Sequence, residues 1–260
     1  MVQEPKTKDE IARHLRELFG MTKGYTIGKD GLVTASETVM ALPNISIPRL
    51  PIAFAEAHED FIVSGLGLRD LSGTPRKVIG TFAANHNPGL SLDGAPEVVH
   101  GAVELHACGL RSLHGIPTNA FEYVVSDNEL TSLDGISSDR PGISIDAIGN
   151  HLADLTGCPP NTIMLDVSNQ KVPMRSLKGL PGGITYLALD DGSPMLLVLG
   201  TRIKDFGDRT QLKLEGPRTN HLLHGQIRSL LKDYHGQGYN GIVPMAARML
   251  KLGLRAQARL

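Results

Sequence analysis

The chain has 260 residues, with 26 Lys plus Arg against 27 Asp plus Glu, so its charge gives no general reason to expect nucleic acid or an anionic membrane as a partner. Apolar residues make up 41% of the sequence, which is enough for a packed core and argues against global disorder. Trp is absent and aromatic residues are 4%, so that core must consist of Leu, Ile, Val and Ala. We expect no signal peptide and no transmembrane helix, and the two cysteines fit a reducing compartment.

Residues 1–59 are expected to form an N-terminal cap. Thr7-Lys8-Asp9-Glu10 has the pattern of a capping box, and the apolar spacing after it predicts a helix over residues 8–19 that ends at Gly20. Residues 25–33 read as a β-hairpin around an Asp-Gly turn. Residues 39–52 are interpreted as degenerate first coils of the repeat that follows.

A repeat of about 21 residues organises residues 60–200. Six glycines, separated by 21, 21, 20, 22 and 22 residues, mark it: Gly73, Gly94, Gly115, Gly135, Gly157 and Gly179. Leu stands two residues before each glycine, and Pro stands two residues after each except Gly135. Internal periods of this length are typical of solenoids, in which each unit buries its apolar face only against its neighbours.

Each repeat also carries an apolar pair spaced by two residues, such as Phe82 and Ala84 or Val103 and Leu105. This spacing predicts a short strand with one buried face. A mostly Asn position follows each pair after three residues, and we expect its side chains to satisfy buried backbone groups. The members of this position are Asn87, Cys108, Asn128, Asn150 and Gln170.

These patterns together predict an α/β repeat protein, a leucine-rich-repeat-like solenoid. We expect one parallel sheet of short strands, a mostly non-helical convex side at the Gly-x-Pro turns, and helical caps at both ends. The C-terminal cap is placed at residues 201–260, where Asn220 and Pro244 have the positions of helix starts.

Residues between the buried pairs should point to the concave side, the usual binding surface of such solenoids. Across three such positions the repeats hold six carboxylates and no Lys or Arg. Residues 60–195 hold 8 basic and 15 acidic side chains, whereas residues 196–260 hold 11 basic and 4 acidic ones. One interpretation is an acidic groove for a basic protein surface, and the other is an ordinary solvated face. The candidate binding residues are Glu104, His106, Glu122, Val124, Asp146, Ile148, Met164, Asp166 and Tyr186.

Nothing in the sequence predicts catalysis, a cofactor or a metal centre. No phosphate loop, nucleophile elbow or dinucleotide fingerprint is present. Cys108 is expected to be a buried structural residue, and Cys158 lies too many coils away to reach it. His221, His224 and His235 cluster in the C-terminal segment without the further ligand that a zinc site needs.

The segments Leu110–Pro117 (LRSLHGIP) and Leu130–Gly135 (LTSLDG) resemble the repeats of leucine-rich-repeat-like proteins encoded by tailed bacteriophages. The resemblance covers nearly the whole chain. It includes the hairpin at residues 25–31, the LPIAF segment at 50–54 and the tail segments 232–238 and 247–253. The sequence departs from that family in lacking its G-x-F-x-C strand regularity, and the coil near Leu197 and Leu199 is blurred.

The resemblance implies the solenoid fold and a phage origin, and for function it implies protein binding. The expected partner is a host or phage protein, with no nucleic acid and no membrane, and the oligomeric state stays open. The place of action would be the host cytoplasm, or the virion if the chain is a structural component of capsid or tail. The repeat is also similar to that of secreted bacterial effectors with a ubiquitin-ligase domain, but no Cys follows the repeats here, so that activity is not carried over.

Overall fold

The computed structural model describes residues 7–174, 178–181, 183–190 and 211–215. The chain divides into two compact units. The first unit is Met1–Glu129 with Gly135–Ile143, and the second is Leu130–Asp134 with Ser144–Leu260.

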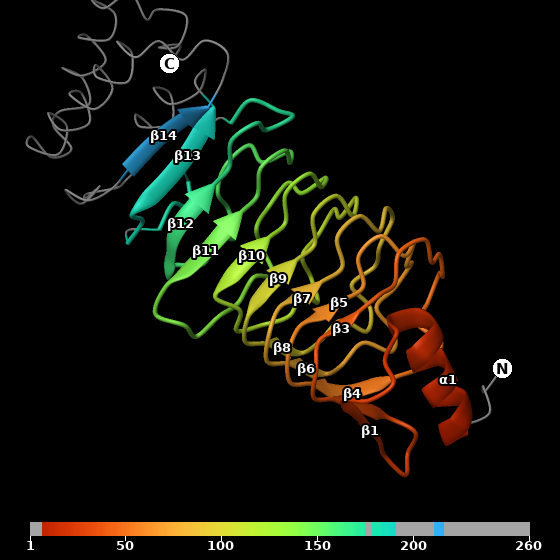
Figure 1. Cartoon of the computed structure of the whole chain (residues 1–260). Coiled ribbons are helices and arrows are strands. Elements are labelled where there is room, and N and C mark those ends of the chain that lie inside the picture. The colour runs from red at the N-terminus through yellow and green to blue at the C-terminus, as the bar shows by residue number, and fades with distance from the viewer. Residues whose placement is uncertain (1–6, 175–177, 182, 191–210, 216–260) are drawn as a thin grey trace, which may run out of the picture. The chain divides into compact units, whose positions relative to one another are not determined.

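The predicted N-terminal helix is present as α1 (Lys8–Phe19). Its capping box is complete, because the Glu10 backbone N donates to Thr7 Oγ1 at 3.3 Å and the Thr7 backbone N donates to Glu10 Oε2 at 2.8 Å. The helix ends at Gly20, whose φ of 66° is left-handed. Its apolar side buries Ile11, Leu15 and Phe19, and the Phe19 ring lies edge-on to Phe54 at 5.8 Å between centroids. The helix therefore packs on the beginning of the solenoid (Figure 1).

The predicted hairpin is also present. Strands β1 (Tyr25–Ile27) and β2 (Val33–Ala35) pair antiparallel, and the Leu32 backbone N donates to Asp30 Oδ1 at 3.1 Å within the connecting turn. This turn uses the Asp-Gly pair that the sequence singled out.

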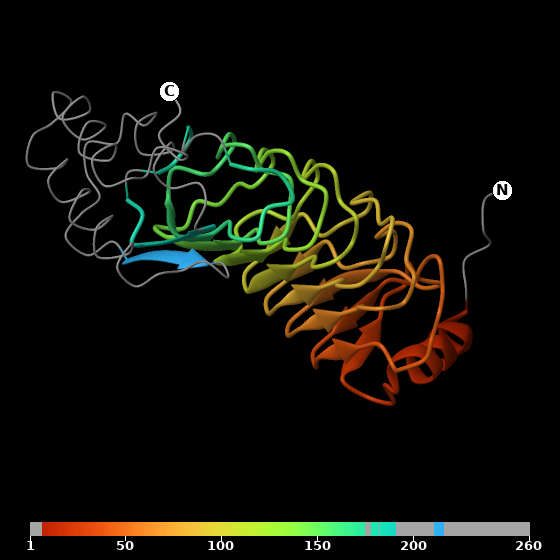
Figure 2. The same ribbon diagram turned by 90° about the horizontal axis from the view of Figure 1, so that it is seen from above.

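The repeated strands form a parallel-sheet solenoid of about seven turns. In the first unit the strands of the longer sheet are β3 (Val39–Met40), β5 (Phe61–Ile62), β7 (Phe82–Ala83), β9 (Ala102–Glu104) and β10 (Glu122–Val124). Their register aligns one buried residue per coil, namely Val39, Phe61, Phe82, Val103 and Tyr123. Figure 2 shows these strands along one side of the unit and the turns arching on the other.

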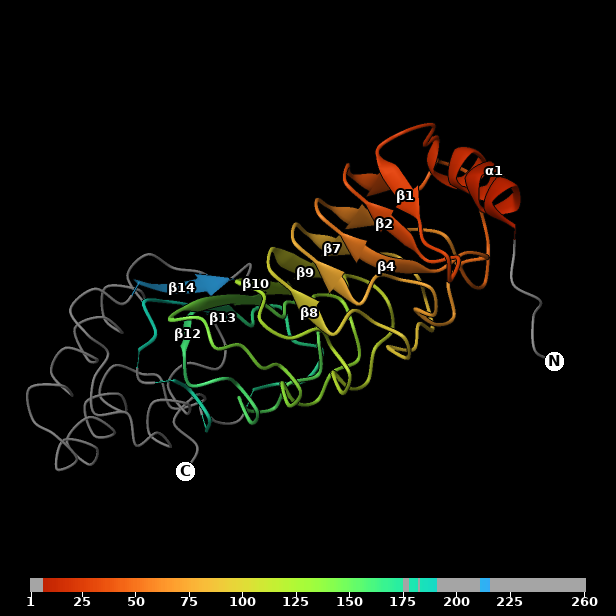
Figure 3. The same cartoon turned by 90° about the horizontal axis from the view of Figure 1, so that it is seen from below.

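The prediction of one parallel sheet is wrong, because the first unit carries a second, five-stranded sheet. It consists of β1, β2, β4 (Phe54–Ala57), β6 (Lys77–Val78) and β8 (Val98–Val99), and all its pairs after the hairpin are parallel (Figure 3). Strands β6 and β8 directly follow the Gly-x-Pro turns that begin at Gly73 and Gly94. Each of β6 and β8 has two residues and one buried valine, which is too short to show a period of two.

A glycine corner separates the two sheets. A Cβ atom on Gly101 would lie 2.3 Å from the Gly80 carbonyl oxygen, so the coils approach there more closely than any side chain permits. The repeat glycines allow a second close approach, at the Gly-x-Pro turns. All six have positive φ, and a Cβ on Gly135, at φ 114°, would lie 2.4 Å from the Leu113 carbonyl oxygen.

The second unit continues the strand repeat with β11 (Ile143–Asp146, in this unit from Ser144), β12 (Thr162–Asp166), β13 (Tyr186–Asp190) and β14 (Gln211–Glu215). Register aligns Leu165 with Leu187 and Leu187 with Leu212. Strand β14 lies within the predicted C-terminal cap, at a segment for which the sequence predicted no strand; Gln-Leu-Lys-Leu-Glu alternates polar and apolar residues and pairs in parallel with β13. The helices expected after Asn220 and Pro244 lie outside the described residues.

The core consists of the apolar pairs that the repeat predicts. Every described member is at most 1% exposed: Phe61, Val63, Phe82, Ala84, Val103, Leu105, Tyr123, Val125, Ile145, Ala147, Leu165, Val167 and Leu187. Residues between them therefore point outward.

Candidate protein-binding face

The outward residues of the longer sheet form what we call the strand face. In the first unit, register aligns Met40, Ile62, Ala83, Glu104 and Val124 in one row across five strands. Glu122 lies in the row before it, and His106 follows Glu104 by two residues, in the next row. The candidates Glu104, His106, Glu122 and Val124 are each partly exposed.

The second unit presents its own part of the strand face. Met164 and Tyr186 are register partners, and Asp166 pairs with Ala188. Met164 is 43% exposed, which is unusual for a large apolar side chain, and Asp146, Ile148, Asp166 and Tyr186 are partly exposed. All nine residues selected from the sequence thus have some access to solvent.

Several strand-face carboxylates are held by neutral donors of the chain itself. Asp60 Oδ1 accepts from the Thr81 backbone N at 2.7 Å, Asp146 Oδ1 from the Ile148 N at 3.1 Å, and Asp166 Oδ1 from the Ser168 N at 3.0 Å. Such bonds fix the carboxylate group without removing its charge. Each of these carboxylate groups is therefore held in a fixed orientation on its own unit.

Glu104 is fixed by Asn85, a residue that the sequence reasoning missed. The Asn85 Nδ2 donates to Glu104 Oε2 at 2.9 Å, and Asn85 Oδ1 accepts from the His106 backbone N at 2.8 Å. The Asn85 backbone N in turn donates to Ser64 Oγ at 3.0 Å. The sequence gives only a weak indication of this contact. An Asn one strand before an outward Glu reaches it only in some side-chain rotamers.

Among the described residues, the arginine–carboxylate ion pairs lie at the turns, away from the strand face. Arg49 contacts Asp70, Arg76 contacts Glu97, and the Arg111 Nε donates to Glu129 Oε2 at 2.7 Å. Each pair joins successive coils. The Arg49 guanidinium lowers the pKa of Asp70 to about 2. These pairs offset acidic charge on the turns. The three strand-face rows contain no Lys or Arg from β3 to β13, and in β14 Lys213 is the register partner of Ala188.

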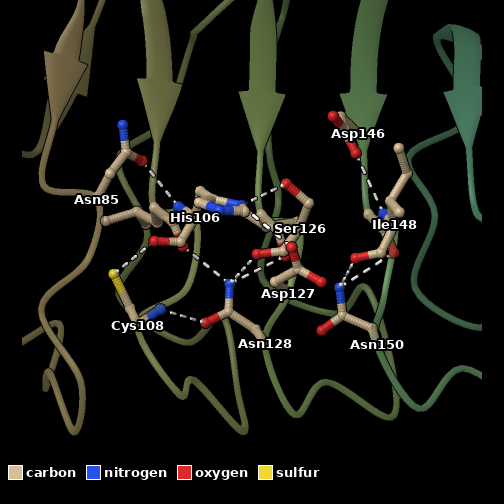
Figure 4. Close-up of polar contacts among 12 residues, drawn as sticks. Asn85, His106, Cys108, Ser126, Asp127, Asn128, Asp146, Ile148 and Asn150 are labelled. Carbon is tan, nitrogen blue, oxygen red and sulfur yellow. Dashed lines mark hydrogen bonds and ion pairs between the residues drawn. The ribbon is translucent and has the colours of Figure 1, made fainter. Parts of the chain in front are cut away.

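The Asn position ends each strand with a set of bonds to the main chain. Asn128 Oδ1 accepts from the backbone N of Cys108 and of Leu110, both at 3.0 Å, and Asn128 Nδ2 donates to the Leu105 carbonyl at 2.8 Å and the Val125 carbonyl at 3.0 Å (Figure 4). Asn87, Asn150 and Gln170 likewise accept from the backbone N of Leu68, Leu130 and Leu152.

Cys108 is the exception at this position, since a thiol offers no comparable acceptor. The corresponding backbone N, that of Leu90, donates instead to the Asn87 carbonyl oxygen at 3.1 Å. The Cys108 Sγ lies 3.1 Å from the Ala84 carbonyl, and burial raises the pKa of this thiol. Cys108 is fully buried, so its position is structural.

Two further repeated features escaped the sequence reasoning. The residue before the Asn position is left-handed in six successive coils of the described part of the chain, with φ between 53° and 70°, at Gly65, His86, Ala107, Asp127, Gly149 and Asn169. Three residues before the repeat glycine, a Ser or Asp side chain accepts from the backbone N two residues later, at Asp70, Ser91, Ser112, Ser132 and Asp154. The recurring Ser or Asp was the visible signal for the second feature.

His106, Ser126 and Asp127 lie together at the strand ends and have the residue types of a hydrolase triad, but their geometry differs from that of a triad. Ser126 Oγ and Asp127 Oδ2 lie 3.0 Å and 3.7 Å from the same ring nitrogen of His106, Nδ1 (Figure 4). A triad needs the nucleophile and the carboxylate on opposite ring nitrogens. The arrangement therefore cannot pass a proton from Ser126 through His106 to Asp127.

Within the ranges that the structure describes, no three His, Cys, Asp or Glu side chains are grouped so that they could hold a metal ion. His221, His224 and His235 lie outside those ranges. The part of the chain that is described contains no helix with the length and apolar character needed to span a membrane.

The architecture places this chain in the class of parallel-sheet solenoids. No family model, no curated protein and no solved structure matches it.

Proposed function

We propose that this chain is a protein-binding solenoid that engages a basic surface of its partner through the strand face. The observation that carries the proposal is that the strand-face rows of β3 to β13 hold carboxylates and no Lys or Arg. Outward carboxylates such as Glu104 and Asp166 are held in place by Asn85 and by backbone N–H groups, while arginines lie at the turns. Fixed, partly desolvated carboxylates lose little freedom on meeting a cation, which favours binding.

The identity of the partner rests on the resemblance of the LTSLDG and LRSLHGIP segments to leucine-rich-repeat-like proteins of tailed phages. On that basis we propose that the chain is phage-encoded and that its partner is a host protein or another phage protein. The alternative of a structural virion component predicts that the protein is present in purified particles, which mass spectrometry of the virions measures.

Affinity capture from host lysate tests the binding face. Substituting Glu104→Gln, Asp146→Asn and Asp166→Asn removes three charges, and the amide oxygens can still accept the bonds that these side chains make. A matched control, Asp93→Asn, Glu97→Gln and Asp139→Asn, removes three exposed charges at the turns. We expect the first variant to lose its captured protein and the control to retain it. Equal capture by both would contradict binding through the strand face.

A further inference from the structure

The strand face of the first unit changes character along its length. At its beginning it is apolar, with Met40 54% exposed and Ile62 partly exposed. Ala83 follows in the same row, and then Glu104 and Val124. One row therefore runs apolar, apolar, small, acidic and apolar across five parallel strands.

The two small residues of this face are covered by longer neighbours. Ala83 is only 3% exposed although it points outward, because its register partners, Ile62 and Glu104, are both longer. In the neighbouring row Ala102 is 5% exposed beside Glu122. A partner that crosses the row therefore contacts the longer side chains, which are apolar at its beginning and acidic at Glu104.

The distance between neighbouring strands favours one conformation for a partner segment that crosses them. Neighbouring strands are about 4.8 Å apart. A helix rises about 1.5 Å per residue, so about 3.2 residues span one strand, which matches its i, i+3 and i+4 rows. An extended segment repeats its same-side side chains only every ~6.7 Å and falls out of register.

Glu104 supplies the specific contact. Its carboxylate is held by the Asn85 amide, and no Lys or Arg among the described residues forms an ion pair with it. A guanidinium matches a carboxylate in two parallel hydrogen bonds and loses less hydration than an ammonium group. A fixed carboxylate between Ala83 and Val124, with Ile62 one strand further, therefore favours an arginine with apolar neighbours.

We infer that the strand face of the first unit binds an amphipathic α-helix lying across the strands, with its apolar residues on Met40 and Ile62 and an arginine on Glu104. This inference rests on the proposed function and specifies its partner. Counting about 3.2 helix residues per strand, the arginine stands about ten residues after the apolar residue that meets Met40.

The test uses two labelled, alanine-rich synthetic helices of about 18 residues and the full-length protein. The first carries leucine at the first, fourth, eighth and fifteenth positions and arginine at the eleventh, and the second has the same composition with that arginine on the opposite helix face. Fluorescence anisotropy measures binding. We expect the first helix to bind at least about tenfold more tightly than the second, since a fixed charge pair is worth about a factor of ten or more.

Protein variants locate the contact. Glu104→Gln should reduce the affinity for the first helix about tenfold, and Met40→Ser should reduce it by a similar factor, whereas the turn variant Asp93→Asn should leave it unchanged. Circular dichroism melting of each variant verifies that it is folded. Equal binding of the two helices, or no effect of Glu104→Gln in a folded protein, overturns the inference. If the strand-face charges still control capture from lysate in that case, the proposed function stands and only the helical mode of binding is lost.

Discussion

The side-chain oxygen of Asn128 accepts a hydrogen bond from the backbone nitrogen of Cys108, one coil earlier, at 3.0 Å. Both residues are fully buried, so the strand end of one coil depends on the side chain of the next. Similar hydrogen bonds between neighbouring coils recur at Asn87, Asn150 and Gln170. Substitutions at the Asn position therefore measure how much these bonds stabilise the stacking of the coils.

Asn128→Ala should lower the free energy of unfolding by about 2–4 kcal/mol, because it leaves several buried backbone groups without partners. Urea unfolding followed by circular dichroism measures the change. Cys108→Ala at the same repeat position is the matched comparison, and it should cost only about 1 kcal/mol because the Leu90 backbone N already has another acceptor. Similar losses in the two variants would show that the amide bonds are not what stabilises the strand ends.

Both cysteine thiols should be unreactive in the folded protein. Burial raises the pKa of Cys158 to about 11, so at pH 8 only about one molecule in a thousand carries its thiolate. Cys158 is half-buried, whereas Cys108 is fully buried. Titration with a thiol-specific chromogenic disulfide should give no rapid phase in native buffer and two equivalents in denaturant. A rapid native equivalent would mean that one of the two sites is open.

The Arg49–Asp70 pair should make stability depend on acid pH. The folded pKa of Asp70 is about 2, below its ordinary value of 3.8, so its stabilising contribution is complete above about pH 4 and disappears as the pH falls towards 2. Arg49 is well exposed, and solvent screening keeps the contribution to at most about 1 kcal/mol.

Asp70→Asn is the variant that isolates this effect. The unfolding free energy of wild type should exceed that of the variant by a constant amount near neutral pH, and the difference should shrink from about pH 4 downward. Differential scanning calorimetry across this range measures it. A difference that grows on acidification would contradict the direction of the shift.

Much of the solenoid could be predicted from the sequence, because the same residue types return once per coil. The repeat glycines mark the turns, and the apolar pairs mark the buried side of the strands. Phe82, Val103 and Tyr123 are registered as their spacing from Gly94, Gly115 and Gly135 indicates. The second sheet could not be predicted, since Val78 and Val99 are single buried residues in two-residue strands. Strand β14 was missed because it lies beyond the last repeat glycine.

The candidate face could be predicted only as a list of outward positions. Alternation placed Glu104 and Asp166 outward, and the structure agrees. It could not reveal that Asn85 holds Glu104, that Asp166 bonds the Ser168 backbone, or that Arg76 pairs with Glu97 at the turns, because these contacts join residues through rotamers that no period encodes.

The Tyr123 hydroxyl should stabilise the coil in which the second sheet ends. Beyond the isolated bridge of Val98 with Thr118, the Tyr123 hydroxyl donates to the Ser137 carbonyl at 3.0 Å and accepts from the Ala120 backbone N at 3.3 Å. Tyr123→Phe should therefore lower the unfolding free energy by about 1–2 kcal/mol. Tyr25→Phe, in the partly exposed hairpin, should change it by less than about 0.5 kcal/mol. Thermal melts measure both variants. If Tyr123→Phe and Tyr25→Phe destabilise the protein equally, the Tyr123 hydroxyl does not stabilise this coil.

Cross-linking across the strand face tests the register of the coils most directly. Ala83 and Glu104 are register partners on neighbouring parallel strands, whereas Val124 lies one strand further. Neighbouring strands are about 4.8 Å apart, within disulfide reach, and two strands span about 9.6 Å, beyond it. Under mild oxidation the pair A83C/E104C should close a disulfide, and A83C/V124C should not, as measured by peptide mass spectrometry. Efficient closure of the second pair, or none in the first, would contradict the stacked coils on which the strand face depends.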